Sequence, residues 1–343
     1  MRYSCLFLSL LLLPGFWACQ SQPIVPIKLE GPAQGTSYHI TYYGEGAADW
    51  QPDIDSLLER VNESLSTYHE GSLINQFNQA DSLVTDDPLF IEMVDRSRAI
   101  ARTSEGTFDP SVMPLVRAWG FGPDNALVPK VENLDSLRQF IGMEKILERP
   151  GPNGGRVFTK AQPGVQLDFN AIAQGYTVDL LSRYLEQRGI VNYLVELGGE
   201  VRTRGENPEG ESWTLGVEKP IDIAGISELA TLIELGDMAA ATSGNYRKFY
   251  EQDGVRYSHT IDPATGRPVQ HTLLSTTVLA ADGTTADAYA TAFMVMGLAR
   301  AKAFITAHPE LELEAYFISS AAPGNYVFDA TPGMQRRLRA VAD

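Results

Sequence analysis

Hydrophobic and polar positions in the first third of the chain follow the spacing of strands and helices. Residues Thr36–Tyr43 are rich in β-branched and aromatic side chains, as strands are. Apolar positions within residues 54–61 recur at three- and four-residue intervals, which places them on one face of a predicted helix. A second helix is expected over about Pro88–Thr103. The apolar face of the first helix consists of Ile54, Leu57, Leu58 and Val61.

A proline- and glycine-rich segment interrupts this pattern at residues 108–123. It holds three prolines and two glycines among large apolar residues, which predicts a shaped, irregular loop instead of a helix. Loops of this kind often carry function.

The middle of the chain predicts a helix whose first turn can bind an anion. Residues 165–168 are strand-like and lead through Asn170 into a long amphipathic segment that ends near Arg188. Asn170 is expected to cap this helix, and Gly175 permits close approach to it. A helix N-terminus presents unpaired backbone N–H groups and a partial positive charge, so it is a suitable place for phosphate.

The second half of the chain predicts mainly strands, and the mixture of elements favours an α+β fold, with mixed sheets packed against helices, over a doubly wound sheet. No Gly-x-Gly-x-x-Gly follows a strand and no Gly-x-x-x-x-Gly-Lys occurs, so neither a Rossmann dinucleotide site nor a P-loop is indicated. Strands are expected near residues 192–197, 213–217, 231–235, 256–261, 273–280, 314–318 and 326–329, and helices directly after residue 280 and near residues 299–308 and 334–341.

Composition and charge agree with a folded domain that binds neither nucleic acid nor anionic lipid. The 343 residues are 44% hydrophobic and 20% charged, with a mean hydropathy of −0.14, which is ample for one large core or two smaller ones. The formal net charge is −16. Such an acidic protein repels polyanions unless a bound cation or local donors offset its field.

The first residues of the chain form a targeting signal. Arg2 precedes an apolar run at residues 5–13 that is too short to span a bilayer, and Ala18 precedes Cys19. The arrangement resembles a bacterial lipoprotein signal, which predicts a signal peptide at residues 1–18 and a lipidated Cys19. Residues 19–32, with three prolines, are expected to be a tether for the domain at residues 33–343. We therefore expect an extracytoplasmic, lipid-anchored protein of the bacterial cell envelope.

The chemistry of the domain must use oxygen and nitrogen ligands, because both cysteines lie in the signal segment. Asp287 and Thr291 are four residues apart in a predicted helix, so both oxygens project from one face. Magnesium needs only one or two carboxylates when substrate phosphate completes its shell. For this pair alone, a structural role is favoured over metal binding. In that alternative Thr291 donates a hydrogen bond to the carbonyl four residues earlier, and Asp287 is a solvated surface charge. Asp282 is the expected N-cap of the same helix.

Nine sequence blocks, in order, resemble the ApbE family of FAD:protein FMN transferases over nearly the whole mature chain. Each is short, but their order along the chain is specific. They are Gly35-Thr-Ser-Tyr38, Ser66-Thr-Tyr68 with Phe77-Asn78, Phe108-Asp-Pro-Ser-Val-Met-Pro-Leu115, Trp119-Gly-Phe-Gly-Pro123, residues 167–175, Glu196-Leu-Gly-Gly199, Ala241-Thr-Ser-Gly-Asn-Tyr-Arg247, Ser258-His-Thr-Ile-Asp-Pro263 with Thr265-Gly266, and Thr285-Ala-Asp287 through Thr291.

The resemblance implies an ApbE-like fold, a flavin site and a magnesium site. For the cation it implies the backbone carbonyl of Ala171, the carboxylate of Asp287 and the hydroxyl of Thr291. For Trp119 and Phe121, packing in the core is an equally good interpretation. The residues implied for FAD are Gln34, Tyr68, Trp119, Gly120, Phe121, Asp168, Gln174 and Ile261.

The implied reaction is magnesium-dependent transfer of FMN from FAD to a threonine hydroxyl of an acceptor flavoprotein, with release of AMP. His259 is the best candidate for the base, although a lone histidine is as often a satisfied buried group. Thr242, Ser243 and Arg247 are candidates to contact phosphate or the acceptor. Alternatively, Thr242 and Ser243 cap a following helix. Family acceptors carry an Asp-x-x-Thr/Ser-Gly-Ala-Thr-like motif, and residues 262–268 lack its last two residues.

Two other functions are compatible with the same residues. One is a magnesium-dependent FAD pyrophosphatase that releases FMN and AMP, in which water replaces the threonine. The other is a surface lipoprotein that binds a flavin without catalysis. A non-catalytic binder has little need of a cation at the pyrophosphate, so the predicted site argues against the last alternative.

Overall fold

The computed structural model describes residues 25–123, 134–221, 228–246, 249–252, 255–322 and 324–341. The predicted signal segment, Cys19 and Arg247 lie outside these ranges. Within them, no helix is both long enough and apolar enough to cross a bilayer.

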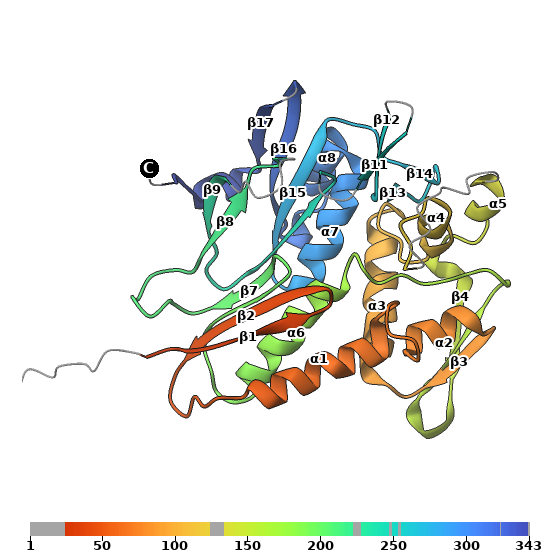
Figure 1. Cartoon of the computed structure of the whole chain (residues 1–343), viewed down its shortest axis with the longest axis horizontal. Coiled ribbons are helices and arrows are strands. Elements are labelled where there is room, and N and C mark those ends of the chain that lie inside the picture. Colours follow the sequence, from red (N-terminus) through yellow and green to blue (C-terminus); the bar gives the residue numbers. More distant parts are fainter. Residues whose placement is uncertain are drawn as a thin grey trace, which may run out of the picture.

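An eight-stranded antiparallel sheet forms the centre of the fold (Figure 1). Its order is β1-β2-β6-β7-β10-β15-β16-β17, and each neighbouring pair is antiparallel. The sheet is therefore not of the Rossmann type, as the sequence predicted. The strands are β1 (Ile27–Ala33), β2 (Thr36–Tyr43), β6 (Asn192–Leu197), β7 (Glu200–Arg204), β10 (Ala239–Gly244), β15 (Leu273–Ala280), β16 (Glu314–Ala322) and β17 (Asn325–Ala330).

Both faces of this sheet are covered. Along β15, Val278 and Ala280 belong to the hydrophobic cluster that contains α7, whereas Leu279 belongs to the cluster on the opposite face of the sheet. Successive side chains of a strand point to opposite faces, so one strand contributes to both clusters. A small sheet of order β18-β9-β8 supplies part of the second cluster. Its strands are β8 (Thr214–Glu218), β9 (Leu229–Glu234) and β18 (Leu338–Arg339), and α9 (Pro332–Arg337) precedes β18.

Helices α6 (Ala173–Glu186) and α7 (Gly283–Met296) pack on the first face, and α7 is the central element of the fold. All residues of α7 except Thr285 and Thr291 are buried. A helix that is apolar on all sides is stable only inside a core. The outer helices are α1 (Gln51–Leu65), α2 (Leu73–Gln79), α3 (Pro88–Thr103) and α8 (Leu298–Ala307).

Smaller elements complete the fold (Figure 1). They are the sheet of β3 (Ser82–Thr85), β4 (Ile146–Pro150) and β5 (Arg156–Lys160), the hairpins β11 (Phe249–Gln252) with β12 (Val255–Ser258) and β13 (Ile261–Asp262) with β14 (Arg267–Pro268), and the helices α4 (Met113–Ala118) and α5 (Leu134–Arg138).

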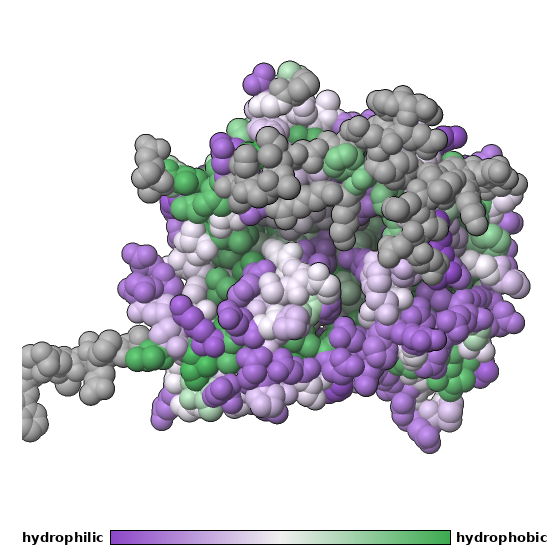
Figure 2. Space-filling model, in the orientation of Figure 1, coloured by the Kyte–Doolittle hydropathy of each residue, from purple (hydrophilic) through white to green (hydrophobic). Residues whose placement is uncertain are grey.

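Hydrophilic residues cover much of the lower part of the face in Figure 2, along α1.

Most predicted elements are confirmed, and five local predictions are wrong. The predicted tether at residues 19–32 overlaps β1, which begins at Ile27 and pairs with β2 in the central sheet. Residues 165–168 form a single bridge, between Gln166 and Val112, instead of a strand. Helix α6 begins at Ala173, so Asn170 does not cap it. The segment at residues 108–123 contains the short helix α4, which the prolines permit because Pro114 lies in its first turn. The last helix ends at Arg337, and a strand follows it.

Candidate functional site

Helices α6 and α7 cross in close contact at two glycines. A Cβ atom on Gly175 would lie 2.2 Å from the carbonyl oxygen of Gly283, and one on Gly283 would lie 2.5 Å from the carbonyl oxygen of Gly175. Both obstacles are backbone atoms, which no change of rotamer moves, so both positions require glycine. The close approach predicted at Gly175 is therefore an approach to α7.

Asp287 is buried at this crossing. Only 5% of its surface is exposed, and its Oδ2 accepts a hydrogen bond from the Gly175 amide at 3.0 Å. Loss of solvation raises the pKa of Asp287 to about 7, and the charge of Asp179 adds to the effect, whereas the Gly175 amide opposes it. The alternative that Asp287 is a solvated surface charge is wrong.

The same hydrogen bond satisfies an amide in the first turn of α6. Gly175 is the third residue of that helix, so its amide has no acceptor within the helix. Asp287 supplies that acceptor. The amide of Tyr176 donates to the carbonyl of the N-cap residue Ile172 at 3.0 Å. Ala171, whose carbonyl is a predicted cation ligand, lies two residues before the helix begins.

Thr291 lies one turn after Asp287 and is one of the two α7 residues that are not buried. Its Oγ1 is 3.1 Å from Oγ of Ser243 on β10. The adjacent Thr242 hydroxyl is 2.8 Å from Oγ1 of Thr277. Thr242 and Ser243 lie in a strand, so the alternative that they cap a helix is wrong.

The candidate metal ligands at this crossing are all hard oxygen atoms. In the described part of the chain, no group of three or more histidine, cysteine, aspartate or glutamate residues is placed to hold a metal ion. A site built from one carboxylate, one hydroxyl and one carbonyl needs no such group. It is the kind of partial shell that magnesium completes with water and phosphate. The chemistry of Asp287, Thr291 and Ala171 therefore fits a hard divalent cation.

Two carboxylates fix the start of α7. Asp282 caps it as predicted, accepting from the Thr285 amide at 2.7 Å, and forms an ion pair with Arg96 at 2.6 Å. Asp179 on α6 accepts from the first two amides of α7 at 2.7 and 2.8 Å and is paired with Arg202 at 2.6 Å. These contacts hold Asp287 in position. Asp179 was not predicted as a site residue, because the amides that it binds lie more than a hundred residues further along the chain.

Glu200 is a second buried carboxylate near Asp287. It is 6% exposed, and its Oε2 has no hydrogen-bond partner among the described residues. Burial, and then the charge of Asp287, raise the pKa of Glu200 well above its ordinary value. Sequence reasoning missed this residue, although it directly follows the Glu196-Leu-Gly-Gly199 block.

Two of the predicted flavin-site residues meet at the first turns of α6. Gln34 lies in the turn between β1 and β2 with a φ of 48°, and its Nε2 donates to Oγ1 of Thr177 at 2.7 Å. Gln174 packs against the β6–β7 turn, where a Cβ on Gly198 would lie 2.6 Å from its Nε2. Both amides are therefore next to the Asp287 crossing.

Asp168 connects this region to the loop at residues 108–123. Its amide donates to the carbonyl of Pro110 at 2.7 Å, and its Oδ1 accepts from the amide of Asn170 at 2.9 Å. Tyr68 is 67% exposed, yet partial loss of solvation and the charge of Asp168 raise its pKa. A phenol whose pKa responds to Asp168 lies within electrostatic reach of it.

The aromatic residues of the predicted flavin site divide into packed and accessible ones. Trp119 is buried, its indole N–H donates to the Gly266 carbonyl at 2.7 Å, and it stacks on Tyr257 at 5.6 Å between ring centroids. The packing interpretation therefore holds for Trp119. Phe121 and Gly120 keep some solvent exposure, whereas Ile261 is buried in the same cluster as Trp119.

His259 lies beside this aromatic cluster. Its ring meets Phe121 edge-on, at 6.4 Å between centroids. Asp262, the last residue of β13, organises the turn that follows, since its carboxylate accepts from the Ala264 amide at 2.9 Å and the Thr265 hydroxyl at 3.0 Å.

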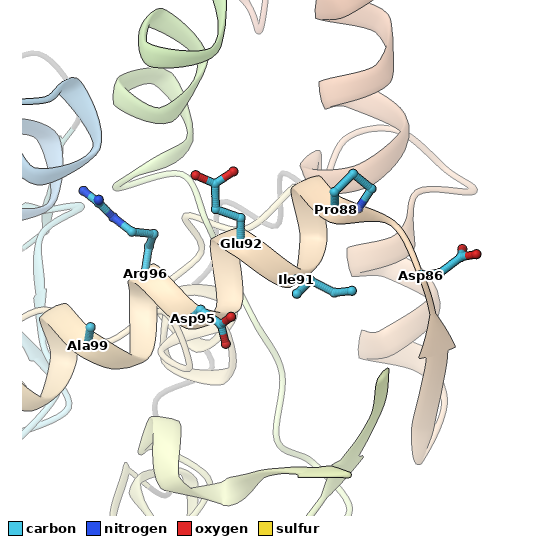
Figure 3. A pocket seen from close by; sticks show the side chains of 7 residues that line it. All are labelled: Asp86, Pro88, Ile91, Glu92, Asp95, Arg96 and Ala99. Atoms are coloured by element: carbon cyan, nitrogen blue, oxygen red, sulfur yellow. The ribbon is translucent and has the colours of Figure 1, made fainter. Parts of the chain in front are cut away.

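A separate groove of about 520 Å³ runs along α3, and none of the predicted site residues lines it. In Figure 3, Glu92 and Arg96 point from the same side of α3. Glu92 is paired with Arg183 at 2.8 Å and Arg96 with Asp282, so the charges on that side are satisfied within the protein. The groove is lined by Asp86, Pro88, Ile91, Glu92, Asp95, Arg96 and Ala99.

Comparison with known proteins identifies relatives over most of the chain. The model of the ApbE family matches residues 34–317. The FAD:protein FMN transferase of Vibrio cholerae is 41% identical over 312 residues, which cover 88% of this chain and 89% of the relative. The solved structure of the flavin transferase ApbE from Vibrio cholerae superimposes with a TM-score of 0.77 at 37% identity, covering 92% of this chain and all of that one. The apo structure of Pseudomonas stutzeri flavinyl transferase ApbE gives 0.79 at 29% identity, covering 93% and 98%.

Proposed function

The chain belongs to the ApbE family, and from this premise we propose that it transfers FMN from FAD to a threonine hydroxyl of an acceptor flavoprotein, in a magnesium-dependent reaction that releases AMP. Relatives that carry the name FAD:protein FMN transferase support the class of reaction. The threonine acceptor, the metal and the leaving group are the parts that this proposal adds.

The observation that carries the proposal is the hydrogen bond from the Gly175 amide to Asp287. It orients the Asp287 carboxylate at the first turn of α6, and Ala171 lies two residues before that helix begins. Thr291 presents a hydroxyl from the next turn of α7, on the side of the helix that is not buried. A cation held by these three oxygens would lie at the start of α6.

A bound magnesium ion would offset the negative charge of the FAD pyrophosphate and of the departing AMP. This answers the electrostatic problem of a protein with a net charge of −16 that binds an anionic substrate. Gln34 and Gln174 supply neutral amides at the first turns of α6, where they can hold the substrate without adding charge.

The residues around Phe121 and His259 complete the proposed site. Phe121 and Tyr68 offer aromatic faces to the isoalloxazine ring. The threonine oxygen attacks the FMN-side phosphorus, the bond from that phosphorus to the AMP oxygen breaks, and His259 takes the threonine proton. The product is a phosphoester between FMN and the acceptor.

The acceptor is a separate protein in this proposal. The nearest match to the acceptor motif within the chain is at residues 262–268, and there the hydroxyl of Thr265 donates to Asp262 inside a turn. A threonine engaged in this way is a poor acceptor.

Product analysis distinguishes transfer from hydrolysis. The soluble domain from Gln20 onward is incubated with FAD, Mg²⁺ and an acceptor protein, and AMP and free FMN are quantified by chromatography. Transfer predicts AMP without an equal amount of free FMN, and loss of AMP release when the acceptor threonine is changed to valine. Equal AMP and FMN with either acceptor would establish an FAD pyrophosphatase instead. Intact FAD in all reactions would exclude both transfer and hydrolysis and leave flavin binding without catalysis as the function.

We further propose that the protein acts outside the cytoplasm, anchored to the cell envelope by lipid on Cys19 and held off the membrane by the residues that precede β1, which begins at Ile27. The signal pattern around Arg2 and Ala18 supports this proposal. In cells, Cys19→Ala is expected to remove the protein from the membrane fraction. Unchanged membrane association of that variant would contradict lipid anchoring.

A further inference from the structure

Glu200 is held inside the protein without the contacts that normally accompany a buried carboxylate. It is the first residue of β7 and follows the tight turn at Gly198 and Gly199. Within the described ranges Oε2 has no hydrogen-bond partner, and the one hydrogen bond that lowers the pKa of the carboxylate comes from the backbone of Glu200 itself. Buried carboxylates are ordinarily paired, hydrogen-bonded or bound to a metal.

The charge that acts most strongly on Glu200 is the carboxylate of Asp287, and Glu196 adds a weaker repulsion. The nearest basic residue along β7 is Arg202, two positions further on. Its guanidinium donates to Asp179 at 2.6 Å and is therefore engaged at the start of α7. Two buried carboxylates thus act on each other, and in the described part of the chain no basic side chain forms an ion pair with either of them.

We propose that Glu200 is part of the cation site, and that its Oε2 binds the ion or one of the waters that the ion keeps. A divalent cation between Glu200 and Asp287 removes their repulsion and gives Oε2 its missing partner. The site then holds two carboxylates, which is the upper end of the usual number for magnesium with substrate phosphate. This inference rests on the cation site of the proposed function.

The competing explanation is that Glu200 is a protonated carboxylic acid with a purely structural role. Glu200→Gln separates the two, because glutamine has nearly the same shape and is neutral, as the protonated acid is. A structural acid predicts that the variant binds metal as the native protein does. A role at the cation predicts loss of metal affinity without loss of folding.

The test is a titration of the nucleotide-free domain with Mn²⁺, in which electron paramagnetic resonance reports the free ion. Glu200→Gln and Asp287→Asn are compared with the native protein, and Glu92→Gln serves as the control, since it neutralises a carboxylate on α3 outside the site. We expect Glu200→Gln to weaken Mn²⁺ binding by about tenfold or more, Asp287→Asn to weaken it further and Glu92→Gln to leave it unchanged. The melting temperature of the metal-free Glu200→Gln variant should equal or exceed that of the native protein.

The outcomes separate two claims, which are the role of Glu200 and the existence of a cation site at Asp287. Native affinity in Glu200→Gln with loss in Asp287→Asn would overturn the role of Glu200 and leave the proposed cation site intact. Native affinity in both variants, or no binding by the native protein, would overturn the two-carboxylate site. A lower melting temperature of Glu200→Gln with native Mn²⁺ affinity would establish the structural role. FMN transfer itself is judged separately, by the product analysis.

Discussion

Replacing Gly175 by alanine tests whether the α6–α7 crossing organises the site. The added methyl group would lie 2.2 Å from the Gly283 carbonyl oxygen and 2.6 Å from Cβ of Asp287, so the helices must move apart. Overpacking of this kind costs about 1–3 kcal/mol, and the better helix propensity of alanine returns up to about 1 kcal/mol. We therefore expect a net loss of about 1–2 kcal/mol, or a fall in Tm of about 2–4 °C.

The effect on activity should be larger than the effect on stability. Separation of the helices lengthens the 3.0 Å bond between the Gly175 amide and Asp287, which moves the carboxylate away from Thr291 and Ala171. Thermal denaturation and acceptor labelling are measured side by side for Gly175→Ala. Gly71→Ala is the matched control, because a Cβ there meets nothing within 4 Å. Native Tm and native labelling in Gly175→Ala would refute the reasoning.

Two further changes test separate parts of the site, and a third tests an ion pair outside it. Ser243→Ala removes the partner of the Thr291 hydroxyl, and Mg²⁺ titrations of activity should show a several-fold higher requirement at an unchanged Tm; an unchanged requirement would contradict a positioning role. His259→Gln should lower kcat for transfer while fluorescence titration shows native FAD affinity, and a native kcat would exclude His259 as the base. Burial raises the pKa of Glu92, but the hydrogen bonds from Arg183 and Tyr176 outweigh this effect and lower the pKa. The ion pair with Arg183 therefore stabilises the folded protein at neutral pH, and this contribution is lost as acid protonates Glu92. Because both side chains are partly exposed, Glu92→Gln should cost no more than about 1 kcal/mol near pH 7 in denaturant unfolding, and a cost that persists in acid would contradict an ionic origin.

Periodicity alone predicted most elements of the fold. Strand β15 and helix α3 have the expected bounds, because their apolar spacing is regular and their ends carry clear signals, such as Pro88 after the capping Asp87. The start of α6 was misplaced because Asn170 is a good cap in isolation. In the structure the preceding segment instead follows the bridge between Val112 and Gln166 and the bond from Asp168 to Pro110, which are tertiary contacts.

The candidate site was predictable where a residue's chemistry shows in its local sequence. Asp282 was assigned as a cap from its position alone and is confirmed. The spacing of Asp287 and Thr291 by itself favoured roles other than metal binding, and the family resemblance is what implied their place in the site. The burial of Asp287 was not predictable, since it results from the contact of Gly175 with Gly283, about a hundred residues away. Glu200 was missed for the same reason, because nothing in its own strand indicates that α7 places a second carboxylate beside it.

The central claim is that a cation held through Asp287 enables FMN transfer to a threonine. The most direct test is the intact mass of an acceptor protein after incubation with FAD and either the native domain or Asp287→Asn, each with Mg²⁺ and with chelator. We predict that the acceptor gains the mass of one FMN only with the native domain and Mg²⁺. The same gain with Asp287→Asn, or with the native domain in chelator, would contradict the account.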